Sequence, residues 1–227
     1  MAEPNPEELF NLGMLSYDKQ DFSKARKYFE KACDLNNGGG CGALGDLYDD
    51  GKGVEKNLTK AAYLYSKACD LKEGLGCKRL WSLYYYGRGV EKNLIKAAQY
   101  ASKACDLNNG GGCSNLGVLY QNGQVVQKDL TKAAYLYSKA CDLKEGLGCF
   151  NLGALYYNGK GVEKDLIKAA YFYSKACELK ESFGCGALAV LYINGQGVEK
   201  NLTKAAQYIS KACKLGDQKA CEVLKEK

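Results

Sequence analysis

The chain has 227 residues, of which 46% are hydrophobic and 26% are charged, proportions typical of globular proteins. It contains no histidine, which argues against most hydrolases and zinc enzymes because histidine is their usual general base and metal ligand. The net charge is +6, and basic and acidic residues are interspersed along the chain, so we expect no nucleic-acid binding. No run of about 18 apolar residues occurs, so we expect no membrane span.

Twelve cysteines recur with a fixed period, in pairs eight positions apart that follow one another every 36 residues. Such a period is the signature of a repeat array. We therefore expect one repeat domain over residues 1–227. Its expected parts are a shorter N-terminal capping repeat at 5–40, full repeats at 41–76, 77–112, 113–148, 149–184 and 185–220, and a C-terminal cap at 221–227.

The capping repeat differs from the others in length and in its turn. Leu12 to Leu44 spans 32 positions, whereas Leu44 to Leu80 spans 36, and Asp18 to Asp21 replace the longer glycine-containing turn. Terminal repeats are often atypical because they close the stack.

Each full repeat contains two predicted helices. In the repeat at 41–76, the second helix begins after Asn57, a good N-cap residue. It ends near Leu71, with Gly74 as a helix stop. The next first helix is expected from about Cys77 to Tyr86. The N-cap place is held in the other repeats by Asn93, Asp129, Asp165 and Asn201, and the expected core positions are Leu58, Ala61, Ala62, Tyr65, Ala68, Leu80, Leu83 and Tyr84.

A glycine-rich turn connects the first helix to the second, as in Gly87 to Val90. Val125 departs from this Gly-x-Gly-Val-x-Lys pattern, and Gln127 replaces the glutamate of the other turns. Either a left-handed glycine is not required in that repeat, or its turn is strained.

The cysteine pairs lie at a predicted helix–helix junction, where two antiparallel helix ends can bring the side chains within bonding distance. We expect the disulfides Cys33–Cys41, Cys69–Cys77, Cys105–Cys113, Cys141–Cys149, Cys177–Cys185 and Cys213–Cys221. Metal binding and free thiols are the alternatives, and the spacing of eight does not suit a structural zinc site. Disulfides imply an oxidising compartment, so we expect a secreted or periplasmic protein whose export signal is missing from this mature or recombinant chain.

Differences between the repeats are concentrated on one side of the first helices, at one, two, five, eight and nine places after the cysteine. Stacked repeats would align these positions into a concave groove, and its aromatic, arginine and asparagine content favours binding of a protein or peptide segment. Neutral variation of solvated positions is the alternative. The predicted partner-binding residues are Asp46, Asp49, Asp50, Lys78, Arg79, Trp81, Ser82, Tyr85, Tyr86, Ser114, Asn115, Val118, Gln121, Asn122, Phe150, Ala154, Tyr157, Asn158, Val190, Ile193 and Asn194.

Three details refine this prediction. Trp81 replaces a small residue of the other repeats and is interpreted as a binding anchor, with a core substitution as the alternative. Acidic Asp46 and basic Arg79 in neighbouring repeats imply a partner of complementary charge. On the second helices, the Tyr/Gln alternation at position 63 and its equivalents is interpreted as packing between repeats or on the inner wall.

The repeated motifs Ser-Lys-Ala-Cys-[Asp/Glu]-Leu, Gly-Cys, Leu-Gly-x-Leu-Tyr and Gly-x-Gly-Val-x-Lys-[Asn/Asp]-Leu resemble the Sel-one-like repeat (SLR) family, and more narrowly its cysteine-rich secreted Helicobacter members. The resemblance covers about Glu7 to Cys221. It implies an all-α fold, an α/α solenoid in which tetratricopeptide-like helix pairs form a right-handed superhelix with one disulfide per repeat. It also implies export, protein–protein interaction, and an association of some relatives with penicillin binding and weak β-lactamase activity.

That activity needs a Ser-x-x-Lys helix start and two further motifs. Ser16-Tyr17-Asp18-Lys19 matches the first, but neither Ser-Asp-Asn nor Lys-Thr-Gly accompanies it, and Ser16 is more simply a small core residue. We expect no enzyme, no catalytic residue, no metal, no cofactor and a monomer. A purely structural array is a further alternative, and the near-identical repeats fit either recent duplication or an engineered consensus scaffold.

Overall fold

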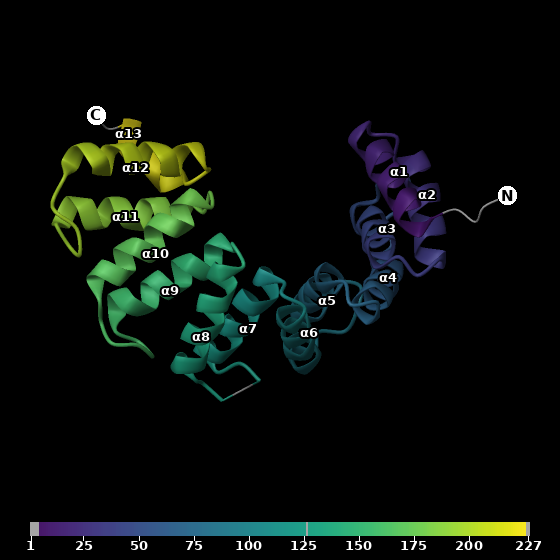
Figure 1. The fold of residues 1–227 in the computed structure, drawn as a ribbon, viewed down its shortest axis with the longest axis horizontal. Coiled ribbons are helices and arrows are strands. Elements are labelled where there is room, and N and C mark those ends of the chain that lie inside the picture. The colour runs from purple at the N-terminus through teal and green to yellow at the C-terminus, as the bar shows by residue number, and fades with distance from the viewer. Residues whose placement is uncertain (1–4, 126, 226–227) are drawn as a thin grey trace. The chain divides into compact units, whose positions relative to one another are not determined.

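The computed structural model describes residues 5–125 and 127–225, and the regular structure within them is α-helical (Figure 1). The chain divides into an N-terminal unit, Met1–Gly112, and a C-terminal unit, Cys113–Lys227. The helices of the first are α1 (Pro6–Asp18), α2 (Phe22–Asp34), α3 (Gly38–Asp50), α4 (Leu58–Asp70), α5 (Gly74–Tyr86) and α6 (Leu94–Asp106). Then follow α7 (Gly110–Asn122), α8 (Leu130–Asp142), α9 (Gly146–Asn158), α10 (Leu166–Glu178), α11 (Ser182–Asn194), α12 (Leu202–Lys214) and α13 (Gln218–Lys225).

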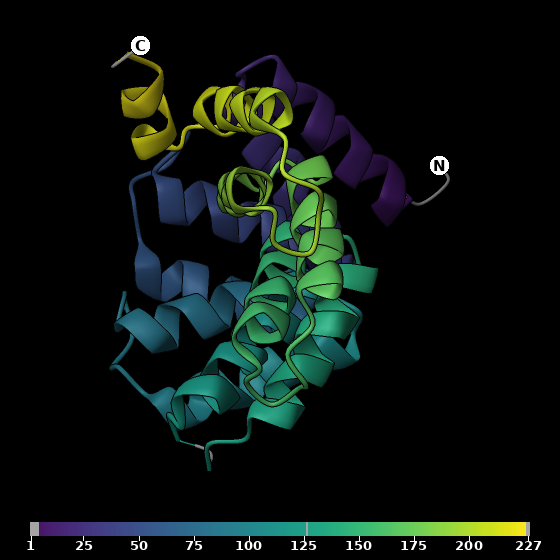
Figure 2. The ribbon, with the colours of Figure 1, turned by 90° about the vertical axis from the view of Figure 1, so that its left-hand side faces the viewer.

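Each repeat is a pair of antiparallel helices, and successive helices within a unit pack side by side, as α9 to α12 do in Figures 1 and 2. Among the described residues, no helix combines the length and the apolar character that a membrane span requires.

The predicted N-caps of the second helices are confirmed. The side chain of Asn57 accepts a hydrogen bond from the backbone N–H of Lys60 over 2.9 Å, which satisfies one of the unpaired donors at the start of α4. The same bond recurs at Asn93, Asp129, Asp165 and Asn201.

The first helices begin one turn earlier than predicted, and Gly74 is not a helix stop. It is the first residue of α5, which Glu73 caps, while α4 ends at Asp70 and Lys72 takes the left-handed conformation that ends the helix at φ 65°. The glycines between paired cysteines therefore belong to helices and do not form the turn, except Gly216, which lies between α12 and α13 with φ +96°. Their role is close approach: a Cβ on Gly76 would lie 2.7 Å from the Cβ of Ala68.

This close approach lets the cysteines bridge the two helices. The described disulfides Cys33–Cys41, Cys69–Cys77, Cys141–Cys149, Cys177–Cys185 and Cys213–Cys221 have Cα–Cα distances of 4.5–4.7 Å. Cys105 and Cys113 are disulfide-bonded as well. The expectation of one disulfide per repeat is thus confirmed, because paired cysteine backbones this close suit the geometry of the bond.

Most predicted core positions are buried, but two are not. Ala61, Tyr65 and Leu83 are at most 1% exposed, whereas Leu58 and Tyr84 are half-buried. Tyr84 instead stacks on Tyr100 of α6 with ring centroids 5.5 Å apart.

The exceptional turn at Val125 is strained. Val125 has φ +69°, the conformation that Gly53, Gly89 and Gly161 adopt in the other turns at φ 66–71°. A β-branched side chain is disfavoured there because its Cβ crowds the backbone. Of the two alternatives drawn from the sequence, the strained turn is therefore correct.

Candidate functional site

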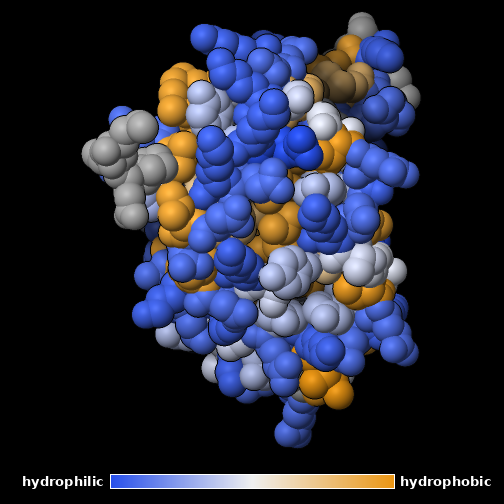
Figure 3. All heavy atoms as spheres, turned by 90° about the vertical axis from the view of Figure 1, so that its right-hand side faces the viewer, coloured by the Kyte–Doolittle hydropathy of each residue, from blue (hydrophilic) through white to orange (hydrophobic). Residues whose placement is uncertain are grey.

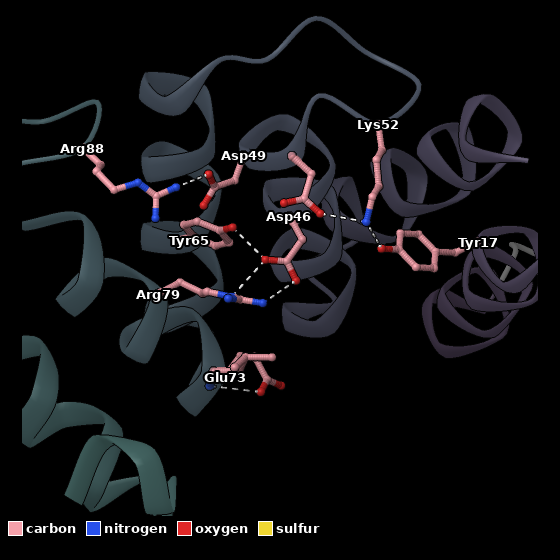
Figure 4. Close-up of polar contacts among 10 residues, drawn as sticks. Tyr17, Asp46, Asp49, Lys52, Tyr65, Glu73, Arg79 and Arg88 are labelled. Atoms are coloured by element: carbon pink, nitrogen blue, oxygen red, sulfur yellow. Dashed lines mark hydrogen bonds and ion pairs between the residues drawn. The ribbon is translucent and has the colours of Figure 1, made fainter. Parts of the chain in front are cut away.

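The predicted acidic residues of the N-terminal unit are paired with basic residues of the same unit (Figure 4). The guanidinium of Arg79, on α5, contacts both carboxylate oxygens of Asp46, on α3, at 3.0 and 3.3 Å. Arg88 donates to Asp49 over 2.6 Å. Each pair links one repeat to the next, with its acid on α3 and its base on α5 or in the turn that follows.

Asp46 has a further partner, because the hydroxyl of Tyr65 donates to its Oδ1 over 2.7 Å. Burial, followed by the negative charge of Asp46, raises the pKa of Tyr65 well above its usual value, so the phenol stays protonated. The carboxylate is thus held by a buried donor on one side and by a guanidinium on the other.

The acidic residues of α3 therefore already have basic partners within the unit, and a binding partner of complementary charge stays a prediction. Asp50 is likewise bound to Lys52 at 2.9 Å, and Lys52 also donates to the hydroxyl of Tyr17 at 2.8 Å. Asp46, Asp49 and Asp50 of α3 are thus each paired with a base, one on α5 and two in the turns that follow α3 and α5, so this region offers a ligand a fixed polar surface.

An aromatic cluster occupies the rest of the exposed side of α5. The ring of Trp81 stacks on Tyr85 at a centroid distance of 5.0 Å and meets Tyr86 edge-on at 6.2 Å. Trp81 is half-buried, and its buried indole nitrogen has no hydrogen-bond partner in the described part of the chain, while Tyr86 is 61% exposed. The cluster, defined by Trp81, Tyr85 and Tyr86, presents apolar area with phenol groups at its edge.

Trp81 also belongs to an exchange of large and small residues between paired helices. In three repeats a glycine on the first helix faces a tyrosine ring on the second: a Cβ on Gly45 would lie 2.7 Å from the ring of Tyr65. In the repeat of Trp81 the tyrosine is replaced by Ala101, which is fully buried. The large residue has moved from the second helix to the first, so the two interpretations of Trp81, anchor and core substitution, are compatible.

In the C-terminal unit, predicted residues of α7 and α9 line an open cleft of about 410 Å³. Its lining carries four amide side chains, three apolar side chains and two lysines: Gln121, Asn122, Asn151 and Asn158, Leu130, Ala154 and Leu155, and Lys128 and Lys160.

Two of these amides are already oriented. The hydroxyl of Tyr137 donates to Oε1 of Gln121 over 3.1 Å, so Nε2 is the end of this amide that can serve a ligand. Asn158 donates from Nδ2 to the backbone oxygen of Ala154 over 2.8 Å, which leaves its Oδ1 to accept. The cleft therefore offers both donors and acceptors.

The other predicted residues are distributed less uniformly. Ser114 is only 1% exposed and its hydroxyl has no partner among the described residues, so its placement on the binding surface is wrong. Phe150 is half-buried between Tyr173 and Phe183. Residues that remain at least partly accessible without a role in the cleft or the aromatic cluster are Lys78, Ser82, Asn115, Val118, Tyr157, Val190, Ile193 and Asn194.

Of the two interpretations of the second-helix variation, packing between repeats is wrong for the tyrosines. Tyr63, Tyr135 and Tyr171 are 54–69% exposed, so they lie on the surface. Tyr65 was expected in the core, but its hydrogen bond to Asp46, like that of Tyr137 to Gln121, was not predicted. In both repeats a first-helix glycine lies against the tyrosine ring, and this pairing of glycine with tyrosine is visible in the sequence.

The serine of the Ser-x-x-Lys pattern is poorly placed for attack on a substrate. Ser16 is 7% exposed, and its hydroxyl donates to the backbone oxygen of Leu12 over 2.9 Å. Within the described part of the chain, no group of three or more acidic or cysteine side chains could hold a metal ion.

Comparison with known proteins identifies the repeat. Residues 40–73, 74–109, 111–145, 146–181 and 182–217 each match the Sel1 repeat, and residues 6–38 match the tetratricopeptide repeat. The chain belongs to the Sel1 repeat family. It is an all-helical Sel1-like solenoid of helix pairs with one disulfide per repeat, as the sequence predicted.

Solved Sel1 structures share this fold. A Sel1 repeat protein from Oxalobacter formigenes is 27% identical with a TM-score of 0.87, over 95% of this chain and 86% of that one. A protective antigen present in uropathogenic Escherichia coli strains, which displays an SLR fold, is 25% identical with a TM-score of 0.82, over 95% of this chain and 47% of that one.

Among curated proteins, "Putative beta-lactamase HcpC" of Helicobacter pylori is 62% identical over 58 residues, which are 26% of this chain and 20% of HcpC. "Beta-lactamase HcpA" of the same species is 55% identical over 58 residues, 26% of this chain and 23% of HcpA. The matched stretch thus spans only about a fifth of the length of these relatives.

Proposed function

We propose that this Sel1 repeat protein is a non-enzymatic scaffold that binds an extended peptide segment of a partner protein on the exposed side of its first helices. The observation that carries the proposal is the amide-lined cleft between α7 and α9. Its lining residues Gln121, Asn122, Ala154 and Asn158 are positions at which otherwise near-identical repeats differ.

The chemistry of the cleft suits a peptide backbone. A peptide presents alternating N–H donors and C=O acceptors. Nε2 of Gln121 can donate to a peptide carbonyl, and Oδ1 of Asn158 can accept from a peptide N–H. Lys128 and Lys160 at the cleft favour acidic side chains in the bound segment.

The repeat architecture supports the same proposal. Repeat solenoids commonly use extended surfaces for protein recognition. Disulfide-clamped helix pairs keep such a surface ordered before binding, which reduces the entropy that a partner would have to offset. The disulfides also support an oxidising, extracytoplasmic location for this function.

The experiment is a selection from a displayed peptide library, followed by fluorescence anisotropy with the enriched peptides. Asn151→Ala with Asn158→Ala should weaken their binding at least about tenfold, since two hydrogen bonds of about 1 kcal/mol each are lost. Tyr135→Ala, at an exposed second-helix position, is the matched control and should bind like the unmodified protein. Failure to enrich any peptide, or equal affinity of the cleft variant, refutes the proposal.

The names of the Helicobacter relatives motivate one direct test of the non-enzymatic part. Nitrocefin turnover by the purified chain should not exceed the buffer rate, and Ser16→Ala should leave it unchanged. The buried hydroxyl of Ser16 and its bond to Leu12 support this expectation. Turnover that Ser16→Ala abolishes would show that the chain is an enzyme.

A further inference from the structure

A second pocket, of about 480 Å³, lies in the N-terminal unit between α2 and the turn that joins α3 to α4. Its side chains come from α2, the end of α3, the turn after α3 and the start of α4, so it is distinct from the first-helix cleft. Three cations and one acid line it together with two neutral polar groups: Arg26, Lys56, Lys60, Glu55, Tyr48 and Asn57.

The neutral groups of this pocket are arranged as donors. Nζ of Lys60 donates to the hydroxyl of Tyr48 over 2.7 Å, so the phenol proton of Tyr48 can be donated elsewhere. Oδ1 of Asn57 accepts a hydrogen bond from the backbone N–H of Lys60, in the first turn of α4, which leaves Nδ2 of Asn57 as a donor. A ligand in the pocket would therefore meet hydrogen-bond donors from several directions.

Arg26 distinguishes this pocket from the related position elsewhere in the chain. Its Nε is buried and has no hydrogen-bond partner among the described residues. A buried unpaired donor is costly, and a guanidinium matches the geometry of phosphate oxygens. The other five second helices carry alanine at the equivalent place: Ala62, Ala98, Ala134, Ala170 and Ala206.

A similar pocket elsewhere in the chain shows how the charge of the Arg26 pocket differs. The pocket beside α8 repeats the same lysines and tyrosine as Lys128, Lys132 and Tyr120, but the N-cap there is Asp129. The carboxylate of Asp129 opposes an anion, whereas the amide of Asn57 does not. The N-terminal pocket thus has the higher positive charge of the two.

We propose that the pocket of Arg26, Lys56 and Lys60 binds a phosphate monoester. Three cations against the one carboxylate of Glu55 leave two positive charges, which match a phosphate dianion. The volume lies in the range of small-molecule sites, so the phosphate can carry an organic group. Figure 3 views the molecule from the side of α1 and α2, and hydrophilic side chains cover much of the face that it shows.

Isothermal titration calorimetry of the full oxidised chain at low salt tests the proposal, with phenyl phosphate as the probe. Arg26→Ala installs the residue of the other five second helices, and Tyr48→Phe removes only a hydroxyl. We expect about tenfold weaker binding for Arg26→Ala and about threefold for Tyr48→Phe. Lys27→Ala, which removes the same charge from α2 outside the pocket, is the matched control and should change the affinity less than twofold.

Two further probes define the ligand class. Phenyl sulfate, a monoanion, should bind more weakly than phenyl phosphate, and inorganic phosphate should also bind more weakly because it lacks the organic group. Absence of saturable phenyl phosphate binding, or equal losses in Arg26→Ala and Lys27→Ala, would overturn the site. Tighter binding of inorganic phosphate would overturn its assignment to an ester.

Discussion

Exchanging Trp81 and Ala101 for the pair found in three other repeats separates the packing role of the tryptophan from its role in binding. The double variant Trp81→Gly with Ala101→Tyr recreates the arrangement of Gly45 and Tyr65. There a Cβ on the glycine would lie only 2.7 Å from the tyrosine ring, so the two helices have room for one large side chain at this level.

The expected energies follow from that limit. Trp81→Gly alone should cost about 3 kcal/mol of unfolding free energy, because a large aromatic group is lost from a half-buried site. Ala101→Tyr alone should cost about 2 kcal/mol, because a ring is forced into a fully buried position beside the indole. The double variant should lose about 2 kcal/mol or less, which gives a coupling of about 3 kcal/mol between the two positions.

Urea denaturation of the four oxidised proteins, followed by circular dichroism, measures this cycle. Additive losses would show that the two side chains do not share one space and would refute the packing argument. Binding gives the second readout: if the aromatic cluster is a partner anchor, a peptide selected on the parent protein that contacts α5 should bind the double variant at least about tenfold more weakly, despite its restored stability.

Three further outcomes are expected. Val125→Gly should raise the unfolding free energy by about 1 kcal/mol in urea titrations, since valine is strained at φ +69°; a loss of stability would show that the side chain makes compensating contacts. Burial raises the pKa of Tyr173 to about 12, and it also raises the pKa of Tyr65. The stability that depends on these protonated phenols should therefore be complete below the ordinary tyrosine pKa of about 10 and fall as the pH rises toward 12. A melting temperature that is constant over that pH range contradicts this prediction. Replacing Cys69 and Cys77 by serine should cost about 2–3 kcal/mol, measured against the oxidised parent, and a loss below about 1 kcal/mol would contradict the loop-entropy estimate.

Local sequence signals predicted much of the fold correctly. Asn57 was identified as an N-cap because the bond it makes reaches only to residue 60. The disulfides were identified because both cysteines lie within one helix–helix junction, eight residues apart. The predicted helix boundaries at this junction were wrong because of its glycines. A glycine that allows close approach of two helices, such as Gly76, cannot be distinguished by sequence from a glycine that ends a helix.

The candidate sites were only partly predictable. The cleft residues Gln121 and Asn158 were found because they vary on one side of a repeated helix. Ser114 shares that pattern but is buried, because side-chain exposure depends on what packs over the helix and not on helical phase alone. Arg26 was not predicted as a site residue, because it lies in the N-terminal repeat, whose length and turn differ from those of the full repeats.

The sequence by itself determined the helices, their N-caps and the cysteine bridges, because each depends on residues close together along the chain, and it determined the repeat through the 36-residue period of the cysteines. The tertiary structure alone decided that Asp46 is bound to Arg79 and Asp49 to Arg88, across 33 and 39 positions. Such pairs form only when successive repeats stack at a particular rotation and distance. The charges that a partner can meet are therefore set by the stacking of repeats, which no single repeat encodes.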